Sequence, residues 1–225
     1  MKKAVIGLSG GMDSATLLGL LLEQGYSVTC CSFQYGSKHM IYESVAAKNI
    51  VQYYKDKGFN VDFRTFDLEL VFLGFDSALL QHGDEIPEGH YKAESMKATV
   101  VPGRNLIFAS IMAGLAESLN AEVVCLGVHA GDHFIYPDCR PSFMSNLAKT
   151  VLASSDGAVN VLTPLLNDTK ASILVRGNKI AVPYHLTRTC YKDQELSCGK
   201  CGSCVERLEA FSELGIKDPI KYELK

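Results

Sequence analysis

AVIGLSGGMDS, residues 4–14, is the stretch that decides the fold of this chain. Its first five residues are an apolar run of the kind that forms a buried parallel strand. From Ser14 to Gln24 leucines recur at helical spacing, and Gly25 is a suitable stop for that helix. A buried strand that turns through a serine and two glycines into a helix predicts the first unit of an open α/β sheet.

Further apolar runs and helical stretches alternate along the rest of the chain. The expected strands are residues 27–33, 61–67, 122–128 and 159–162. The expected helices are residues 40–57, 105–120 and 141–154, with another inside 165–182. Strands that alternate with helices imply crossover connections and helices on both faces of a parallel sheet. We therefore expect an α/β fold with a doubly wound, mostly parallel five-stranded sheet.

Two stretches stand apart from this alternation. Residues 68–100 have no clean period, and a long irregular segment in a compact domain is usually functional, so we predict a lid there.

The length of 225 residues corresponds to about one and a half average domains. We expect one domain at residues 1–187 and a small cysteine-bearing region at residues 188–225 packed on it.

Composition excludes several classes of protein. The net charge of −3 gives no electrostatic case for a nucleic-acid groove, so no nucleic-acid partner is expected. Two lysines precede only five apolar residues at the N-terminus, which is too short for a secretory signal. The most apolar uncharged stretch, residues 105–116, is shorter than the roughly 18 residues of a membrane-spanning helix. The chain is therefore predicted to be cytoplasmic, with no membrane partner.

Seven of the eight cysteines fall into two groups, and the eighth, Cys139, lies in the loop after the fourth expected strand. Cys30, Cys31 and Cys125 lie in apolar strands and are expected to be small core residues. Four others lie within 15 residues, and in a reducing compartment such a cluster favours metal ligands: Cys190, Cys198, Cys201 and Cys204. Four thiolates suit tetrahedral Zn²⁺ in a closed, structural site. Free or redox-active cysteines and an iron–sulfur cluster are the alternatives.

The SGGMDS turn has the chemistry of a phosphate loop. Glycines let the backbone approach an anion closely, and the following helix N-terminus attracts negative charge. Ser9 and Ser14 can donate hydrogen bonds to phosphate oxygens, and Asp13 can hold a Mg²⁺ ion that bridges them. An ordinary glycine-rich turn with a polar helix cap is the alternative. The stretch matches neither the phosphate loop that ends in Gly-Lys-Ser/Thr nor the GxGxxG fingerprint.

SGGMDS directly after a first strand resembles the pyrophosphatase loop (PP-loop) of the adenylating ATPases, which have the adenine nucleotide alpha hydrolase-like fold. The resemblance implies an enzyme that cleaves ATP between its α and β phosphates and transfers AMP to a substrate oxygen. It also implies which residues bind the nucleotide: Leu8, Ser9, Gly10, Gly11, Met12, Asp13, Ser14, Ala15, Thr16, Leu17, Leu18 and Lys170. For Lys170, a solvated surface position is an equally good interpretation.

Later segments narrow the resemblance. VPGRN at residues 101–105, DHFIYPDCRP at residues 132–141 and the cysteine cluster, together with the loop, resemble the 7-cyano-7-deazaguanine synthase family over residues 4 to about 211. The resemblance implies an ATP-dependent carbon–nitrogen ligase of queuosine and deazapurine biosynthesis. Its substrates would be 7-carboxy-7-deazaguanine and ammonia, its cofactors ATP, Mg²⁺ and Zn²⁺, and its assembly a homodimer. No glutaminase segment is recognisable, so ammonia is expected to arrive free or from a partner.

The expected catalytic residues are Asp13, Arg104, Asp138 and Arg140. Because residues 132–140 follow the fourth strand, they are expected over the crevice at the carboxyl ends of the strands. We predict that Asp138 accepts the ring N–H and exocyclic amine of the deazaguanine, and that Arg140 or Arg104 holds the substrate carboxylate or the phosphoryl charge. Tyr136 or Phe134 would stack on the ring. A local ion pair between Asp138 and Arg140 is the alternative.

Lesser candidates and rival functions remain open. Tyr35, His39 and Glu43 follow the second strand, where a pocket wall, a dimer contact or an ordinary surface helix are all consistent with the sequence. The histidines outside this group have no metal-site spacing: His82, His90, His129, His133 and His185. The rival functions are a tRNA thiolase or another adenylating PP-loop enzyme, a zinc-bearing binding module with a vestigial ATP site, and a relative that stops at the amide or acts on a protein.

Overall fold

A computed structural model describes residues 1–91 and 94–223 of the chain. The predicted lid (68–100) and the predicted C-terminal region (188–225) each contain two positions outside these ranges. The strands are β1 (Lys3–Gly7), β2 (Ser27–Gln34), β3 (Val61–Asp67), β4 (Val123–Cys125) and β5 (Asn160–Leu162). All pairings between them are parallel, in the order β3-β2-β1-β4-β5, which confirms the predicted sheet.

The apolar run that opens the chain lies at the centre of this sheet. β1 pairs with β2 on one side and with β4 on the other, so Ala4 faces both Val28 and Val123. Val5 and Ile6 are fully buried because helices cover both faces. The short apolar stretch therefore forms the central strand of the sheet.

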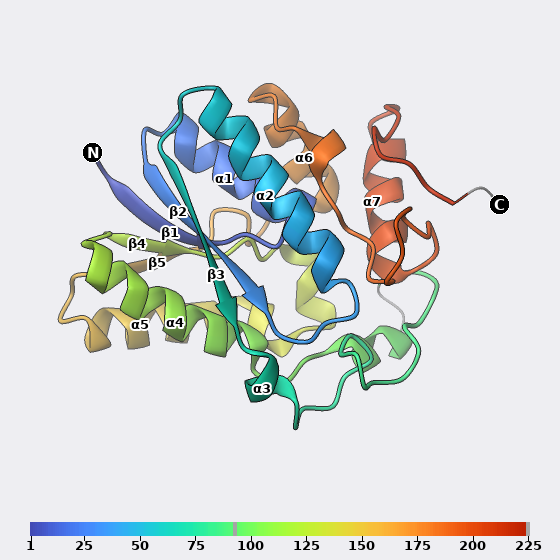
Figure 1. The fold of residues 1–225 in the computed structure, drawn as a ribbon, viewed down its shortest axis with the longest axis horizontal. Helices are drawn as coiled ribbons and strands as arrows, with labels where there is room; N and C mark the ends of the chain where they lie inside the picture. The colour runs from blue at the N-terminus through green and yellow to red at the C-terminus, as the bar shows by residue number, and fades with distance from the viewer. Residues whose placement is uncertain (92–93, 224–225) are drawn as a thin grey trace.

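Helices form two layers around the sheet (Figure 1). One layer contains α1 (Met12–Glu23), α2 (Met40–Asp56) and α6 (Lys170–Lys179), and the other contains α4 (Arg104–Leu119) and α5 (Pro141–Ser154). The two buried clusters that pack against the opposite faces of β1 follow the same division. The doubly wound α/β prediction is confirmed, and α5 has the predicted bounds.

Two predicted elements differ in extent from the observed ones. The strand expected at residues 122–128 ends at Cys125, because the chain leaves the sheet and Leu126, Gly127 and Val128 turn towards a cavity. The segment 68–100 is not entirely irregular, since it contains the short helices α3 (Glu69–Phe72) and η1 (Glu94–Thr99).

A further helix, α7 (Gly202–Glu213), follows the cysteine cluster and was not predicted. Its side chain Arg207 is fully buried and donates two hydrogen bonds to the Asp218 carboxylate, at 2.7 and 2.9 Å. The same guanidinium donates to the hydroxyl groups of Thr187 and Thr189 and to the carbonyl of Tyr184. One buried cation therefore ties α7 to the segments before and after it. The domain boundary at residue 187 stays a prediction.

One segment, Glu94–Leu119, is long and apolar enough to cross a membrane by length and composition alone. Its helical structure is interrupted between η1 and α4, and α4 packs on β1 and β4 through Ala109, Met112 and Ala116. The apolar side chains of α4 thus serve the core, and the segment is weak evidence for a membrane span.

Replacing Arg207 by Met should destabilise the fold by about 3–5 kcal/mol, because the buried Asp218 carboxylate loses its charged partner. The measurement is the free energy of unfolding from denaturant titration. The double variant Arg207→Met with Asp218→Asn should recover part of this loss, and Glu213→Gln, an exposed position on the same helix, should change little. A single variant as stable as wild type would contradict the anchoring role of Arg207.

Candidate active site and metal centre

A cavity opens where β1, β2 and β4 end. It has a volume of about 230 Å³ and is bounded by Gly7, by Cys31–Gln34 and by Leu126–Val128 at the carboxyl ends of these strands. Ligands of open α/β sheets bind at this edge, where the strand order reverses. The glycine-rich loop, the N-terminal parts of α2 and α4, and the segment before the cysteine cluster complete the walls.

The loop residues form a site with unused hydrogen-bond donors. The hydroxyl groups of Ser9 and Ser14 lie 3.2 Å apart, and the Gly11 N–H donates to the Ser9 hydroxyl. No side chain caps the N-terminus of α1, so N–H groups of its first turn stay available for an anion. The arrangement is that of a phosphate cradle.

Gly10 is the point at which three parts of the chain meet. Its φ of +88° suits glycine, and a Cβ there would lie 2.7 Å from the Glu43 carbonyl oxygen and 2.9 Å from the Ala46 side chain of α2. The Gly10 carbonyl also accepts a 2.8 Å hydrogen bond from the Arg188 N–H. The loop therefore contacts both α2 and the segment that leads to Cys190.

Lys170 lies at the centre of a buried charge cluster beside the loop. Its ammonium group lies 2.6 Å from Asp13 Oδ2, 3.2 Å from Glu206 Oε2 and 3.1 Å from His129 Nε2. Burial alone would raise the pKa of Asp13, but the positive charges of Lys170 and His129 outweigh burial and lower it. Asp13 is thus an ionised carboxylate, and its Oδ1 is buried without a hydrogen bond.

His129 is a site residue that the sequence did not reveal. Its Nδ1 accepts the Gly131 N–H at 3.0 Å. Its Nε2 lies 3.5–3.9 Å from three carboxylates, those of Asp132, Glu206 and Asp13. Spacing could not predict this grouping, because its members come from segments far apart in sequence.

The other half of the cavity is aromatic and carries Arg104. The Arg104 guanidinium donates to the Tyr35 hydroxyl at 3.2 Å and lies 5.7 Å from the centre of the Tyr136 ring. The hydroxyl groups of Tyr136 and Tyr191 lie 3.4 Å apart, and Tyr91 donates to Asp132 Oδ1 at 3.0 Å. Arg104 is therefore a fixed cation among flat rings.

His39 and Glu43, whose place the sequence left open, line this cavity from the start of α2. The structure excludes the surface-helix alternative for His39, which is 2% exposed. Its Nε2 lies 3.5 Å from Glu43 Oε2. Burial lowers the pKa of His39 to about 3 and raises the pKa of Glu43 to about 8, so in the free protein both side chains are uncharged at neutral pH.

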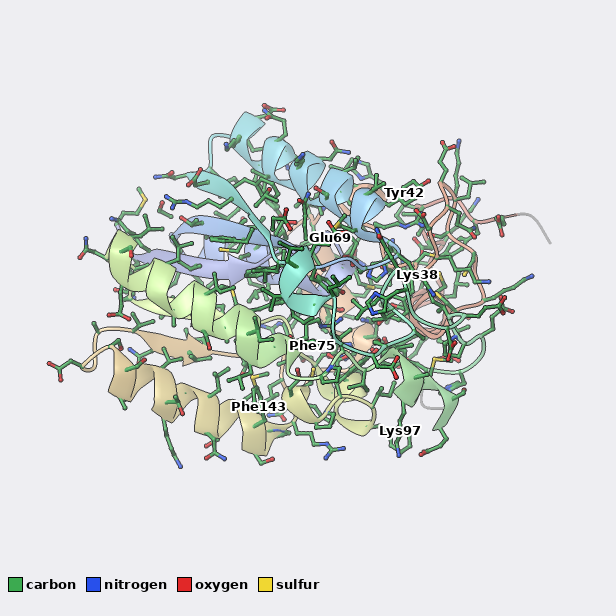
Figure 2. All side chains as sticks on the ribbon, turned by 60° about the horizontal axis from the view of Figure 1, so that its bottom comes forward. Lys38, Tyr42, Glu69, Phe75, Lys97 and Phe143 are labelled. Atoms are coloured by element: carbon green, nitrogen blue, oxygen red, sulfur yellow. The ribbon has the colours of Figure 1, made fainter. Side chains whose placement is uncertain are left out.

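Segments distant in sequence meet at this end of α2. The Arg188 guanidinium lies over the Tyr42 ring, 4.7 Å from its centre. Figure 2 shows Tyr42 and Lys38 at the end of α2 that points towards the C-terminal segment. One wall of the cavity thus combines residues at the start of α2 with residues of the segment around Cys190.

The structure separates the four predicted catalytic residues. Asp13 and Arg104 line the cavity, whereas Asp138 and Arg140 are not among its lining residues. Asp138 Oδ2 accepts the Asn105 N–H at 2.9 Å, and Arg140 donates to the His133 carbonyl instead of forming the local ion pair. Of the two stacking candidates, Tyr136 lines the cavity and Phe134 is exposed. A substrate role for Asp138 and Arg140 stays a prediction.

The predicted nucleotide-binding residues divide in a similar way. Those that line the cavity are Leu8, Ser9, Gly11, Met12, Asp13, Ser14 and Lys170. Gly10 supports the loop from behind, and the rest face the core: Ala15, Thr16, Leu17 and Leu18. Successive residues of α1 point in different directions, so only its first turn reaches the cavity. The surface alternative for Lys170 is excluded, since this side chain is 7% exposed.

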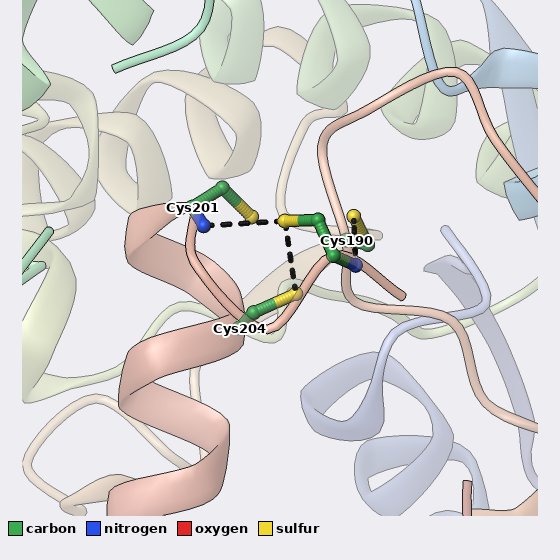
Figure 3. Close-up of side chains that lie close together, drawn as sticks. Cys190, Cys201 and Cys204 are labelled. Carbon is green, nitrogen blue, oxygen red and sulfur yellow. Dashed lines mark hydrogen bonds between the residues drawn. The ribbon is translucent and has the colours of Figure 1, made fainter. Parts of the chain in front are cut away.

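The four predicted metal ligands come together beside α7 (Figure 3). The sulfur atoms of Cys190, Cys198, Cys201 and Cys204 all lie within 4.8 Å of one another, are buried and form no disulfide. Backbone N–H groups donate to the sulfurs of Cys190 and Cys198, as expected for thiolates that carry charge. The thiols of the other three cysteines also lower the pKa of Cys198 by hydrogen bonding. The cluster is suited to a metal ion.

Comparison with known proteins identifies the family. The sequence model of the family described as Queuosine biosynthesis protein QueC matches residues 3–215. This chain belongs to the QueC family. A relative named 7-cyano-7-deazaguanine synthase in Pseudoalteromonas translucida is 42% identical over 222 residues, 99% of each chain. One of the same name in Caldicellulosiruptor saccharolyticus is 44% identical over 99% of this chain and 96% of the relative.

Among solved structures, a tRNA thiolase from Methanococcus maripaludis with its 4Fe-4S cluster matches the fold of this QueC-family chain. The TM-score is 0.51 at 17% sequence identity, and the match covers 94% of this chain and 64% of the thiolase. At that identity the likeness concerns the fold alone. The QueC-family chain thus shares its overall fold with that thiolase.

The raised pKa of Glu43 predicts a pH effect on stability. Between its ordinary value of 4.5 and about 8, the folded chain holds a proton that the unfolded chain has released. This group therefore contributes less stability as pH rises through that range. Glutamine cannot ionise. The difference in unfolding free energy between Glu43→Gln and wild type should therefore shift in favour of the variant as the pH rises from about 5 to about 8. Glu117→Gln, at an exposed position on α4, is the control, and parallel curves for Glu43→Gln and wild type would refute the shift.

Proposed function

We propose that this chain is an ATP-dependent carbon–nitrogen ligase that converts 7-carboxy-7-deazaguanine and ammonia into 7-cyano-7-deazaguanine. Full-length similarity to enzymes of that name is the observation that carries the proposal. The cavity supports it, since a phosphate cradle and an aromatic, arginine-bearing half share one enclosure. Such a site can bind ATP and a flat acid side by side.

The reaction has two activations of the same carbon. The substrate carboxylate attacks the α-phosphorus of ATP, pyrophosphate leaves, and an acyl adenylate forms. Ammonia attacks the acyl carbon, AMP leaves, and a proton is released to give the amide. The amide oxygen then attacks the α-phosphorus of a second ATP with loss of pyrophosphate. Departure of AMP, which carries away the oxygen, and loss of both N–H protons leave the nitrile. No covalent protein nucleophile is required, so positioning and charge stabilisation carry the catalysis.

The residues divide this work between the two halves of the cavity. Ser9, Ser14 and the N-terminus of α1 hold the leaving pyrophosphate, and Lys170 moves from Asp13 to its oxygens. Asp13 would hold Mg²⁺, which would neutralise phosphate charge. The buried, unpaired Oδ1 of Asp13 supports this assignment. Arg104 has donors beyond its bond to Tyr35 and binds the carboxylate or the phosphoryl group under attack.

Asp138 takes a positioning role in this proposal. Its carboxylate and main-chain carbonyl both bind Asn105, the residue next to Arg104. They thereby fix the first turn of α4 and the direction of Arg104.

For the metal we propose Zn²⁺. Tetrahedral Zn²⁺ with bonds of about 2.3 Å separates its sulfur ligands by about 3.8 Å, and Cys198 Sγ and Cys204 Sγ lie 3.9 Å apart. An iron–sulfur cubane holds four cysteine sulfurs at its corners, farther apart than ligands of a single ion. With four thiolates the ion has no open position, so its contribution is structural. We further propose a cytoplasmic protein that forms homodimers and takes ammonia free or from a partner.

The decisive experiment incubates the pure protein with ATP, Mg²⁺, ¹⁵N-ammonium and the deazaguanine acid, and analyses the products by mass spectrometry. We expect a labelled nitrile, with an AMP and a pyrophosphate released at each activation. Asp13→Asn should reduce product formation at least about 100-fold, since the charge that holds Mg²⁺ is lost. An unchanged acid in the wild-type reaction would refute the function. A labelled amide as the final product would instead indicate an enzyme that stops at the amide.

The metal assignment has its own test. Purified protein should contain one zinc per chain and show no iron–sulfur absorbance. Cys198→Ser should lose the zinc and unfold at a lower temperature, because one of four ligands is gone. Cys139→Ser, outside the cluster, is the control and should retain zinc. Iron in stoichiometric amount would contradict the assignment of zinc.

A further inference from the structure

Three carboxylates line the cavity in the described part of the chain, and two of them already have hydrogen-bond partners. Asp13 accepts from Lys170 at 2.6 Å. Both oxygens of Asp132 are occupied, one by the His129 N–H at 3.1 Å and the other by the Tyr91 hydroxyl at 3.0 Å. The oxygens of Glu43 accept no hydrogen bond from any described residue.

The surroundings hold Glu43 in place without using its oxygens. The Nε2 atom of His39, a buried residue one helical turn earlier, lies 3.5 Å from Glu43 Oε2. Two arginines lie close enough to influence the carboxylate, but their hydrogen bonds go elsewhere. Arg104 donates to Tyr35, and Arg188 donates to main-chain carbonyls of the segment 192–195. With 21% of its side chain exposed, Glu43 presents to the cavity two carboxyl oxygens that have no hydrogen-bond partner among the described residues.

The same cavity offers flat apolar surfaces for a ring. Phe33 and Phe108 stack with their ring centres 4.1 Å apart and their planes within 8° of parallel. The Tyr35 ring packs edge-on against Phe108, and the Tyr191 ring lies 5.3 Å from that of His39. A planar heteroaromatic ligand enclosed by these rings would bring its edge to an acid rather than to solvent.

We propose that Glu43 recognises the edge of the purine-like ring that carries a ring N–H beside an exocyclic amine. Its two oxygens accept these two parallel donors, so Glu43 selects rings with an amine at that position. The assignment rests on the function proposed above and gives to Glu43 the role that the sequence suggested for Asp138. Two donors facing one carboxylate also favour its ionised form, which offsets the effect of burial.

Asp138 is poorly placed for this role. Its Oδ2 is occupied by the Asn105 N–H, its carbonyl accepts from the Asn105 side chain, and it is not part of the cavity wall. A ring held by Asp138 would have to displace a hydrogen bond at the start of α4. Glu43 requires no such displacement.

The test compares two acids, 7-carboxy-7-deazaguanine and its analogue without the exocyclic amine. We expect wild type to prefer the amine-bearing acid by about 100-fold or more in kcat/KM, since a site built to accept a donor rejects the ring that lacks it. In Glu43→Gln the ratio should fall below about 10, because the amide places its own N–H against a ring donor. The KM for ATP should stay within about twofold of wild type.

Matched variants separate recognition from general damage. Glu117→Gln on α4 should keep the wild-type ratio, and so should Asp138→Asn even where its overall rate falls. Glu43→Asp keeps the charge on a shorter arm and should give an intermediate ratio. Thermal unfolding and zinc content show whether each variant is folded, and a folding defect lowers the rates for both acids without changing their ratio.

Three results would overturn the assignment: a wild-type ratio in both Glu43 variants, a rise in the KM for ATP alone in Glu43→Gln, or a collapse of the ratio in Asp138→Asn. Failure of the proposed function is distinguishable, because wild type would then convert neither acid. Conversion by wild type with an unaltered ratio in the Glu43 variants would refute the role of Glu43 and leave the proposed function intact.

Discussion

The close packing around Gly10 is the constraint on which the site depends. At this position a side chain would collide with the backbone of α2, and the carbonyl is held by the N–H of Arg188. The glycine-rich loop, the helix that carries Glu43 and the segment before Cys190 are therefore fixed relative to one another through a single glycine. A shift of any one of them would move the other two, so the nucleotide half and the ring half of the cavity keep a constant geometry.

Charge is arranged around this junction in two opposite ways. Beside the loop, three carboxylates surround Lys170 and His129, so the protein balances the charge of these cations with its own acidic side chains. In the aromatic half, Arg104 and Arg188 lie near two side chains that burial keeps uncharged. The half beside the loop is suited to exchanging the partners of its charged side chains. The aromatic half is suited to receiving an anionic, planar molecule.

Local patterns in the sequence were sufficient for much of this structure. The apolar run at residues 4–8, the leucine spacing after Ser14 and the cysteine spacing each depend on neighbours in the chain, and each led to the observed strand, helix or cluster. Residues that act through distant contacts were harder to predict. Glu206 follows the cysteine cluster yet meets Lys170, and Asp138 lies in a suggestive motif but turns towards Asn105. No periodicity encodes such meetings, which depend on the packing of whole helices.

The position of Arg188, Tyr191 and Glu206 near the end of the chain has a consequence for biosynthesis. These residues complete the cavity wall or the charge cluster, and Arg207 fixes them to the main core through Asp218, still closer to the C-terminus. On the ribosome they emerge after all five strands of the sheet. A nascent chain can therefore possess the glycine-rich loop before the walls of the cavity exist, and the two come together only after residues up to Asp218 have emerged.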